Sequence, residues 1–235
     1  MNASGARAAG ASFGAAMMTV VRKDLRLEWR TREVFSATVV FAALVLVTFN
    51  FSFEPGARAV EEMAAGVLWV AFVFAGMLGL NRTFVSEKEG GCMGALFLAP
   101  ADPGALFLGK VISNLIFLAV TEMVVLPLFA LLFNYPLARA FPGLILPLVL
   151  GSLGFVAAGT LFAAMSTQTR IREVMLPLLL LPASVPVLIA SVRVTAGALA
   201  GSGTGGDLPW IGLLVLCDTL FLVAGTFLFG HVLEE

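Results

Sequence analysis

Two carboxyl side chains lie inside long apolar stretches of this 235-residue sequence. Glu122 is in the middle of the run Val111–Phe133, and Asp218 is near the middle of Leu208–Gly230. Carboxyl groups at membrane depth are costly, and they usually face a cavity or a partner helix. Two roles therefore stay open for each: a proton relay or polar substrate contact, or a hydrogen-bonded group that holds helices together. The apolar runs contain no Lys, Arg or His to pair with them, which weakens an ion-coupled carrier.

The sequence offers few other groups for catalysis or metal binding. Its one histidine, His231, lies close to the last residue, and Cys92 and Cys217 form no C-x-x-C pair. Residues 104–110 match the first seven positions of a P-loop, but Val111 stands where a Ser or Thr hydroxyl must bind Mg²⁺. We expect no catalytic residue, no metal site and no directly bound cofactor. We interpret Lys110 as an anchor whose ammonium reaches the membrane surface.

The composition is that of a membrane protein. Apolar residues make up 60% and charged residues 12%, against about 45–50% and 25% in soluble domains. The mean hydropathy is +1.01 and the formal net charge is −1. These values exclude a disordered chain and a soluble nucleic-acid-binding protein. They predict a polytopic membrane domain with little mass outside the bilayer.

Six apolar runs are long enough to cross the hydrocarbon core as helices. They are approximately Val34–Phe53, Met63–Leu80, Val111–Phe133, Gly143–Met165, Val174–Val192 and Leu208–Gly230. The predicted fold class is therefore all-α, with a six-helix domain over residues 34–230. A disordered start over 1–16, an amphipathic helix over 17–33 and a tail over 231–235 complete the prediction. Of the 14 basic residues, 11 fall on the N-terminal side of the bilayer, so the positive-inside rule places both termini in the cytoplasm.

The segment before the first span is an amphipathic helix by its pattern. Met18, Val21, Leu25 and Trp29 form one apolar stripe, and Arg and Lys fill much of the remaining surface. Basic amphipathic helices that carry Trp lie in the interface of anionic membranes. We favour an interfacial elbow over a simple extension of the first span.

The inner loop over residues 81–110 is the longest loop. A charged stretch precedes Gly90 and Gly91, and the apolar stretch that follows is too short to span a bilayer. Docking of a cytoplasmic partner and a re-entrant or surface-lying loop without a partner are equally compatible with this pattern. The docking hypothesis assigns partner contacts to Glu87, Glu89, Gly90, Gly91, Leu96 and Pro100.

The fifth apolar run contains Pro177, Pro182 and Pro186. Each proline removes a backbone donor and favours a kink. We therefore predict that this span bends and is a candidate moving element.

Three stretches resemble the CcmB family, the haem-exporter-type ABC permease of cytochrome c maturation. Residues 22–33 (RKDLRLEWRTRE) resemble its N-terminal start, and residues 91–100 with 106–110 resemble its inner-loop signature. Residues 172–182 (REVMLPLLLLP) with 186–190 are the most distinctive match. The chain departs from the family pattern at Cys92 and Gly94, where a Ser or Thr and an acidic residue are common. The resemblance covers roughly residues 17–230.

The resemblance implies an exporter-type permease subunit in the bacterial inner membrane with no chemistry of its own. It implies a separate ATP-binding subunit like CcmA, membrane partners like CcmC and CcmD, a haem chaperone like CcmE, and a second copy of this chain. Haem is implied as possible cargo of the complex. No histidine lies in the predicted outer loops, which favours transmission of ATP-driven motion over haem passage through this subunit. The alternatives are an exporter-type permease for a lipid, drug or polysaccharide, and an ion-coupled carrier using Glu122 and Asp218.

Overall fold

The computed structural model describes residues 12–31, 33–52, 58–83, 102–135, 137–166, 172–201 and 206–234. These residues form helices and short turns, with no strand among them. The helices, in chain order, are α1 (Phe13–Thr31), α2 (Glu33–Ser52), α3 (Arg58–Thr83), α6 (Pro103–Leu132), α7 (Leu137–Ser166), α8 (Arg172–Ala200) and α9 (Leu208–Glu234).

Every helix from α2 to α9 has the length and hydropathy needed to cross a membrane. The six candidate spans coincide with the six apolar runs of the sequence, and each helix satisfies its own backbone hydrogen bonds. The all-α, polytopic fold class is therefore confirmed. The chain is a multi-pass membrane protein.

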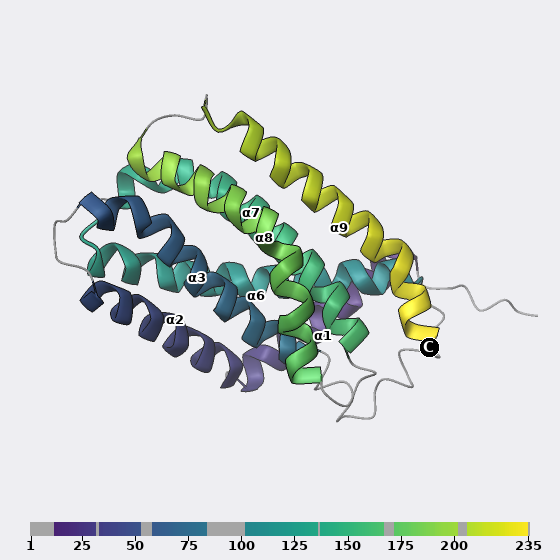
Figure 1. Cartoon of the computed structure of the whole chain (residues 1–235). Coiled ribbons are helices and arrows are strands. Elements are labelled where there is room, and N and C mark those ends of the chain that lie inside the picture. The colour runs from purple at the N-terminus through teal and green to yellow at the C-terminus, as the bar shows by residue number, and fades with distance from the viewer. Residues whose placement is uncertain are drawn as a thin grey trace, which may run out of the picture.

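The spans form one bundle around α7 (Figure 1). α7 packs against α6, α8 and α9, and α3 packs against α2, α6, α7 and α8. α2 and α9 lie on opposite outer sides of the bundle, and α1 lies at one end, beneath the start of α6. The inner helices α3 and α7 are the most buried, because neighbouring spans cover them on several sides.

Among the described residues, the two larger of three apolar clusters fill most of the bundle. One includes Phe107, Phe155 and Phe229 and contains Val20 of α1, so it lies at the α1 end. The other includes Trp69 and Phe129, together with the inner face of α2. Aromatic contacts run through both clusters; the Phe107 and Phe229 ring centroids are 5.6 Å apart.

Helix boundaries differ from the sequence prediction at three places. α1 begins at Phe13, inside the stretch 1–16 that we expected to be disordered, and α9 continues to Glu234 through the expected tail. α6 begins at Pro103, inside the predicted loop 81–110. The Asp102 side chain accepts a hydrogen bond of 2.7 Å from the Gly104 backbone N–H, and Pro103 occupies the first helical position. An N-cap aspartate followed by proline at the first helical position favours the start of a helix here.

α8 is a single helix that contains all three prolines of the fifth run. It changes direction along its course in Figure 1. Each proline leaves a carbonyl one turn earlier without its helical donor, which permits a bend. The role of the three prolines in motion stays a prediction.

Candidate functional site

A buried ion pair fastens α1 to the beginning of α6. The Lys110 Nζ lies 2.9 Å from Asp24 Oδ2, and Lys110 is only 1% exposed. Asp24 also lies 3.3 Å from the exposed ammonium of Lys23. An ammonium buried to this degree requires a carboxylate partner, because the transfer of a charged group out of water costs roughly several kcal/mol per ion. The pair therefore fixes where α1 lies on α6.

The helices approach closely beside this ion pair. A Cβ atom on Gly109 would lie 2.9 Å from Val20 Cβ and 3.0 Å from the Met17 carbonyl oxygen, so a larger residue has no room here. Ala16, Val20 and Val21 form the buried side of α1. The absence of a side chain at 109 is what allows α1 to reach the Lys110 ammonium.

The structure revises two expectations about this region. Lys110 is not a surface anchor: its ammonium faces Asp24 beneath α1, because α1 covers the first turns of α6. The predicted apolar stripe of α1 is split between two surroundings. Val21 is buried, while Met18 is 45% exposed and Trp29 is 71% exposed. The sequence stripe did not reveal that α1 has a second apolar side formed by Ala16 and Val20.

The predicted partner-docking residues lie outside the described residues. They are Glu87, Glu89, Gly90, Gly91, Leu96 and Pro100. The structure describes what flanks them: α3 ends at Thr83 and α6 begins at Pro103, with its N-terminus capped by Asp102.

Glu122 of α6 is buried in the bundle and is held by α7. The Ser152 hydroxyl donates a hydrogen bond to the Glu122 carboxyl group. Glu122 is 6% exposed and Ser152 is 1% exposed, so lipid has little access to the pair. A buried polar group with a hydrogen-bond partner is typical of a contact that joins two helices.

Asp218 of α9 lies against a different part of α7. The residue is 4% exposed, and neither of its carboxyl oxygens has a hydrogen-bond partner among the described residues. Gly154 provides the space for it, because a Cβ there would collide with Asp218 Oδ1. Ser152 and Gly154 are two residues apart on α7 and so lie on different sides of that helix. The structure therefore does not bring Glu122 and Asp218 together as one relay.

A further polar contact joins α3 to the proline-containing α8. Trp69 Nε1 donates a hydrogen bond of 2.9 Å to Thr195 Oγ1. Gly151 of α7 lies beside this contact, since a Cβ there would collide with Trp69 and Ser191. Trp69, Ser191 and Thr195 are each at most 2% exposed. This contact fixes one half of α8 against the centre of the bundle.

Sequence reasoning found the two intramembrane carboxyl groups but not their surroundings. It also missed the partnership of Asp24 with Lys110. One signal was present in the sequence. Asp24 and Lys110 carry opposite charges next to apolar residues, and charges that become buried at the edge of an apolar bundle tend to pair. Which helices meet depends on packing, and hydropathy does not specify it.

These features define a class: a multi-pass helical membrane protein whose amphipathic N-terminal helix is ion-paired to the bundle and whose core carries isolated carboxyl groups. The family model described as "CcmB protein" matches residues 15–234. The chain belongs to this CcmB family.

Curated relatives agree with the family model. Heme exporter protein B of Pseudomonas aeruginosa is 31% identical over 208 residues, which are 87% of this chain and 93% of that protein. Heme exporter protein B of Rhodobacter capsulatus is 31% identical over 173 residues, 74% of this chain and 79% of the relative. The protein of the same name from Paracoccus denitrificans is 27% identical over 200 residues, 85% of this chain and 91% of the relative.

Proposed function

We propose that this chain is the membrane permease subunit of an ABC-type complex of cytochrome c maturation in the bacterial inner membrane. A separate CcmA-like subunit binds and hydrolyses ATP, and CcmC-like and CcmD-like proteins complete the complex together with a second copy of this chain. The name of the relatives, heme exporter protein B, supports haem as the cargo of that complex. ATP hydrolysis is coupled to release of the haem-loaded, CcmE-like chaperone at the outer face.

The observation that carries this proposal is the ion-paired contact of α1 with the first turns of α6. The stretch 81–110, proposed as the docking element for the ATPase, contains the capped start of α6. Lys110 pairs there with Asp24, and Gly109 packs against Val20. A force applied to the docking element therefore acts on α6 and α1 as one body.

The proline-containing α8 is the proposed moving element. α7 and α9 pack on it, and the Trp69–Thr195 hydrogen bond anchors it to α3. A helix with three missing backbone donors bends at low cost, so displacement of α6 and α7 is transmitted along α8 as a change in its curvature.

The two intramembrane carboxyl groups are assigned to helix association. The Ser152 hydrogen bond supports this role for Glu122, and the close contact with Gly154 supports it for Asp218. An ion-coupled carrier requires both groups on one route, and their positions on different sides of α7 count against it. Transport that persists without ATP but is lost in Glu122→Gln would favour the carrier instead.

The test is purification of the intact complex in mild detergent, followed by identification of the bound proteins. We expect an ATPase subunit to co-purify, and we expect the double charge reversal Glu87→Lys/Glu89→Lys to remove it. The matched control is Glu61→Lys/Glu62→Lys, which makes the same charge change in the first turns of α3, on the predicted outer side of the membrane, and should leave the complex intact. Unchanged co-purification after reversal at Glu87 and Glu89 contradicts the docking assignment, and partners unrelated to haem would favour an exporter of another substrate.

A further inference from the structure

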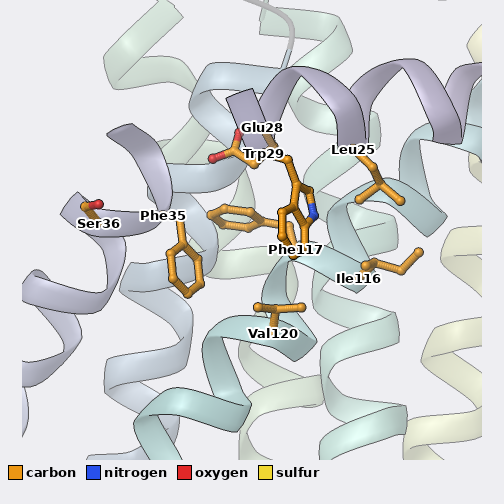
Figure 2. Close-up of a pocket in the computed structure, with 8 residues that line it drawn as sticks. All are labelled: Leu25, Glu28, Trp29, Phe35, Ser36, Ile116, Phe117 and Val120. Atoms are coloured by element: carbon orange, nitrogen blue, oxygen red, sulfur yellow. The ribbon is translucent and has the colours of Figure 1, made fainter. Parts of the chain in front are cut away.

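A cavity of about 400 Å³ lies where α1, α2 and α6 meet (Figure 2). Its volume falls in the range of sites that hold small molecules, about 300–1,000 Å³. Leu25 and Trp29 project into it from α1, while α2 and α6 form the opposite walls. It lies outside the Lys110–Asp24 contact and the carboxyl groups of the bundle. The residues that line it are Leu25, Glu28, Trp29, Phe35, Ser36, Ile116, Phe117 and Val120.

The walls are apolar and held in place by packing. Six of the eight lining side chains are aliphatic or aromatic. Phe35 of α2 and Phe117 of α6 pack edge to face, with ring centroids 6.4 Å apart. Because the two rings come from different spans and hold each other, the slot between them and Trp29 does not simply close by side-chain rotation. An apolar slot of this kind suits a hydrocarbon chain.

The cavity opens toward lipid. Trp29 is 71% exposed, and Ile116 and Val120 on the outer side of α6 are 37% and 39% exposed. α1 lies across α6 and ends near the start of α2 in Figure 2, as expected of an amphipathic helix in the interfacial layer. The cavity is therefore at the boundary between headgroups and acyl chains, where a lipid can enter sideways.

The charges around the cavity have both signs. Glu28 of α1 lines it. Arg22 and Arg26 are exposed, and each precedes a lining residue of α1, Leu25 or Trp29, by three positions. Residues three apart in a helix share a side, so both arginines lie on the side of α1 that carries Leu25 and Trp29. A carboxylate and two guanidinium groups on the same helix complement an ammonium and a phosphate that are joined in one molecule.

We propose that this cavity binds a phospholipid with an ammonium headgroup, of the phosphatidylethanolamine type. One acyl chain occupies the slot between Trp29 and Phe117, the ammonium pairs with Glu28, and the phosphate contacts Arg22 and Arg26. Haem is disfavoured as the occupant: its two propionates would meet Glu28, and none of the eight lining residues is His, Met, Cys or Tyr, the usual axial ligands. The bound lipid fills the angle between α1 and α2. This inference does not depend on the ATPase partner.

The test uses the full complex in nanodiscs of phosphatidylethanolamine and phosphatidylglycerol. A trace of phosphatidylethanolamine with a photoreactive acyl chain is added, and labelled peptides are mapped by mass spectrometry. We expect labelling concentrated on the lining residues of α1 and α6. Val120→Trp fills the slot and lowers that labelling by about tenfold, because the chain loses its contacts there. Val124→Trp is the matched control: Val124 is 43% exposed one turn further along α6, does not line the cavity, and retains full labelling.

The headgroup is tested with a phosphatidylglycerol probe that carries the same photoreactive chain. We expect the ethanolamine probe to label the wild-type cavity several-fold more strongly, and Glu28→Gln to abolish that preference while the chain still binds. Equal labelling by the two probes in the wild type overturns the headgroup assignment. Equal labelling of Val120→Trp and Val124→Trp, whether high or low, overturns the site, as does loss of the label when haem is added.

Discussion

The ammonium of Lys110 on α6 lies 2.9 Å from the carboxylate of Asp24 on α1, and α1 covers it so completely that the lysine is 1% exposed. A pair in this environment contributes mainly to position. Its attraction is offset by the loss of hydration of both groups, yet removal of one partner leaves a buried charge without compensation. The contact therefore determines the register of α1 on α6 and makes that register sensitive to either residue.

The first prediction follows from this asymmetry. Asp24→Asn should lower the stability of the purified protein by about 3–5 kcal/mol, because the buried Lys110 ammonium loses the charge of Asp24. The double variant Asp24→Asn/Lys110→Met should recover most of the loss, because no charge is then buried. The measurement is thermal unfolding in detergent, with tryptophan fluorescence as the probe. Lys23→Met is the control, since the Lys23 side chain is 45% exposed and its pair contributes little. A double variant as unstable as Asp24→Asn would show that the ion pair is not what positions α1.

The second prediction concerns the contact between α7 and α9. Gly154→Ala should destabilise the protein by about 1–3 kcal/mol, because the added methyl group collides with the Asp218 carboxyl group. The partner change Asp218→Ala removes the obstruction, so the double variant should be more stable than Gly154→Ala alone. Gly212→Ala on α9 is the control, because a Cβ at that position meets nothing within 4 Å. Thermal unfolding of the wild type, the two single variants at 154 and 218 and their double variant gives the coupling energy between the two sites. A coupling energy of zero would mean that α9 does not approach α7 at Gly154.

The number and type of the helices could be predicted from the sequence. A bilayer accepts only segments that satisfy their own backbone, so length and hydropathy identify the six spans without knowledge of their packing. The start of α6 could also have been predicted, because Asp102 is a typical N-cap residue and Pro103 is favoured at the first helical position. We placed that boundary too late because Lys110 suggested the edge of the membrane, whereas a buried lysine with a partner is compatible with an uninterrupted helix.

The contacts between helices could not be predicted in the same way. Hydropathy is nearly uniform around α6 and α9, so it does not show which side of either helix faces α7. Glu122 and Asp218 were recognised as unusual by position alone, but their separation by α7 depends on crossing geometry. The cavity below α1 was not anticipated either. It depends on how α1 folds back over α6, and no local sequence signal encodes that angle.

The third prediction separates a helix-joining role of Glu122 from a proton-relay role. Glu122→Gln preserves the shape and the acceptor oxygen, so the Ser152 hydrogen bond is kept and cytochrome c formation should stay within about twofold of wild type. Glu122→Leu removes the acceptor and should reduce the amount of folded protein, because the Ser152 hydroxyl is then buried without its partner. The measurement is haem-stained cytochrome c in cells, normalised to the membrane level of this chain. A loss of activity in Glu122→Gln at normal protein level would overturn the helix-joining assignment and favour proton transfer.

The fourth prediction tests whether the bend of α8 serves the mechanism. Pro182 is exposed on α8, so Pro182→Ala opens no internal cavity and restores a donor for the carbonyl one turn earlier. The helix should become straighter and the protein more stable, by up to about 3 kcal/mol, while ATP-dependent cytochrome c maturation falls. Pro142→Ala makes the same change at an exposed position of α7 and should leave maturation unchanged, because α7 is the packed centre of the bundle. The comparison needs thermal unfolding and cytochrome c yield for both variants. If Pro182→Ala is stabilised and fully active, α8 does not need its bend, and the motion of α1 and α6 must reach the bundle by a route that does not bend α8.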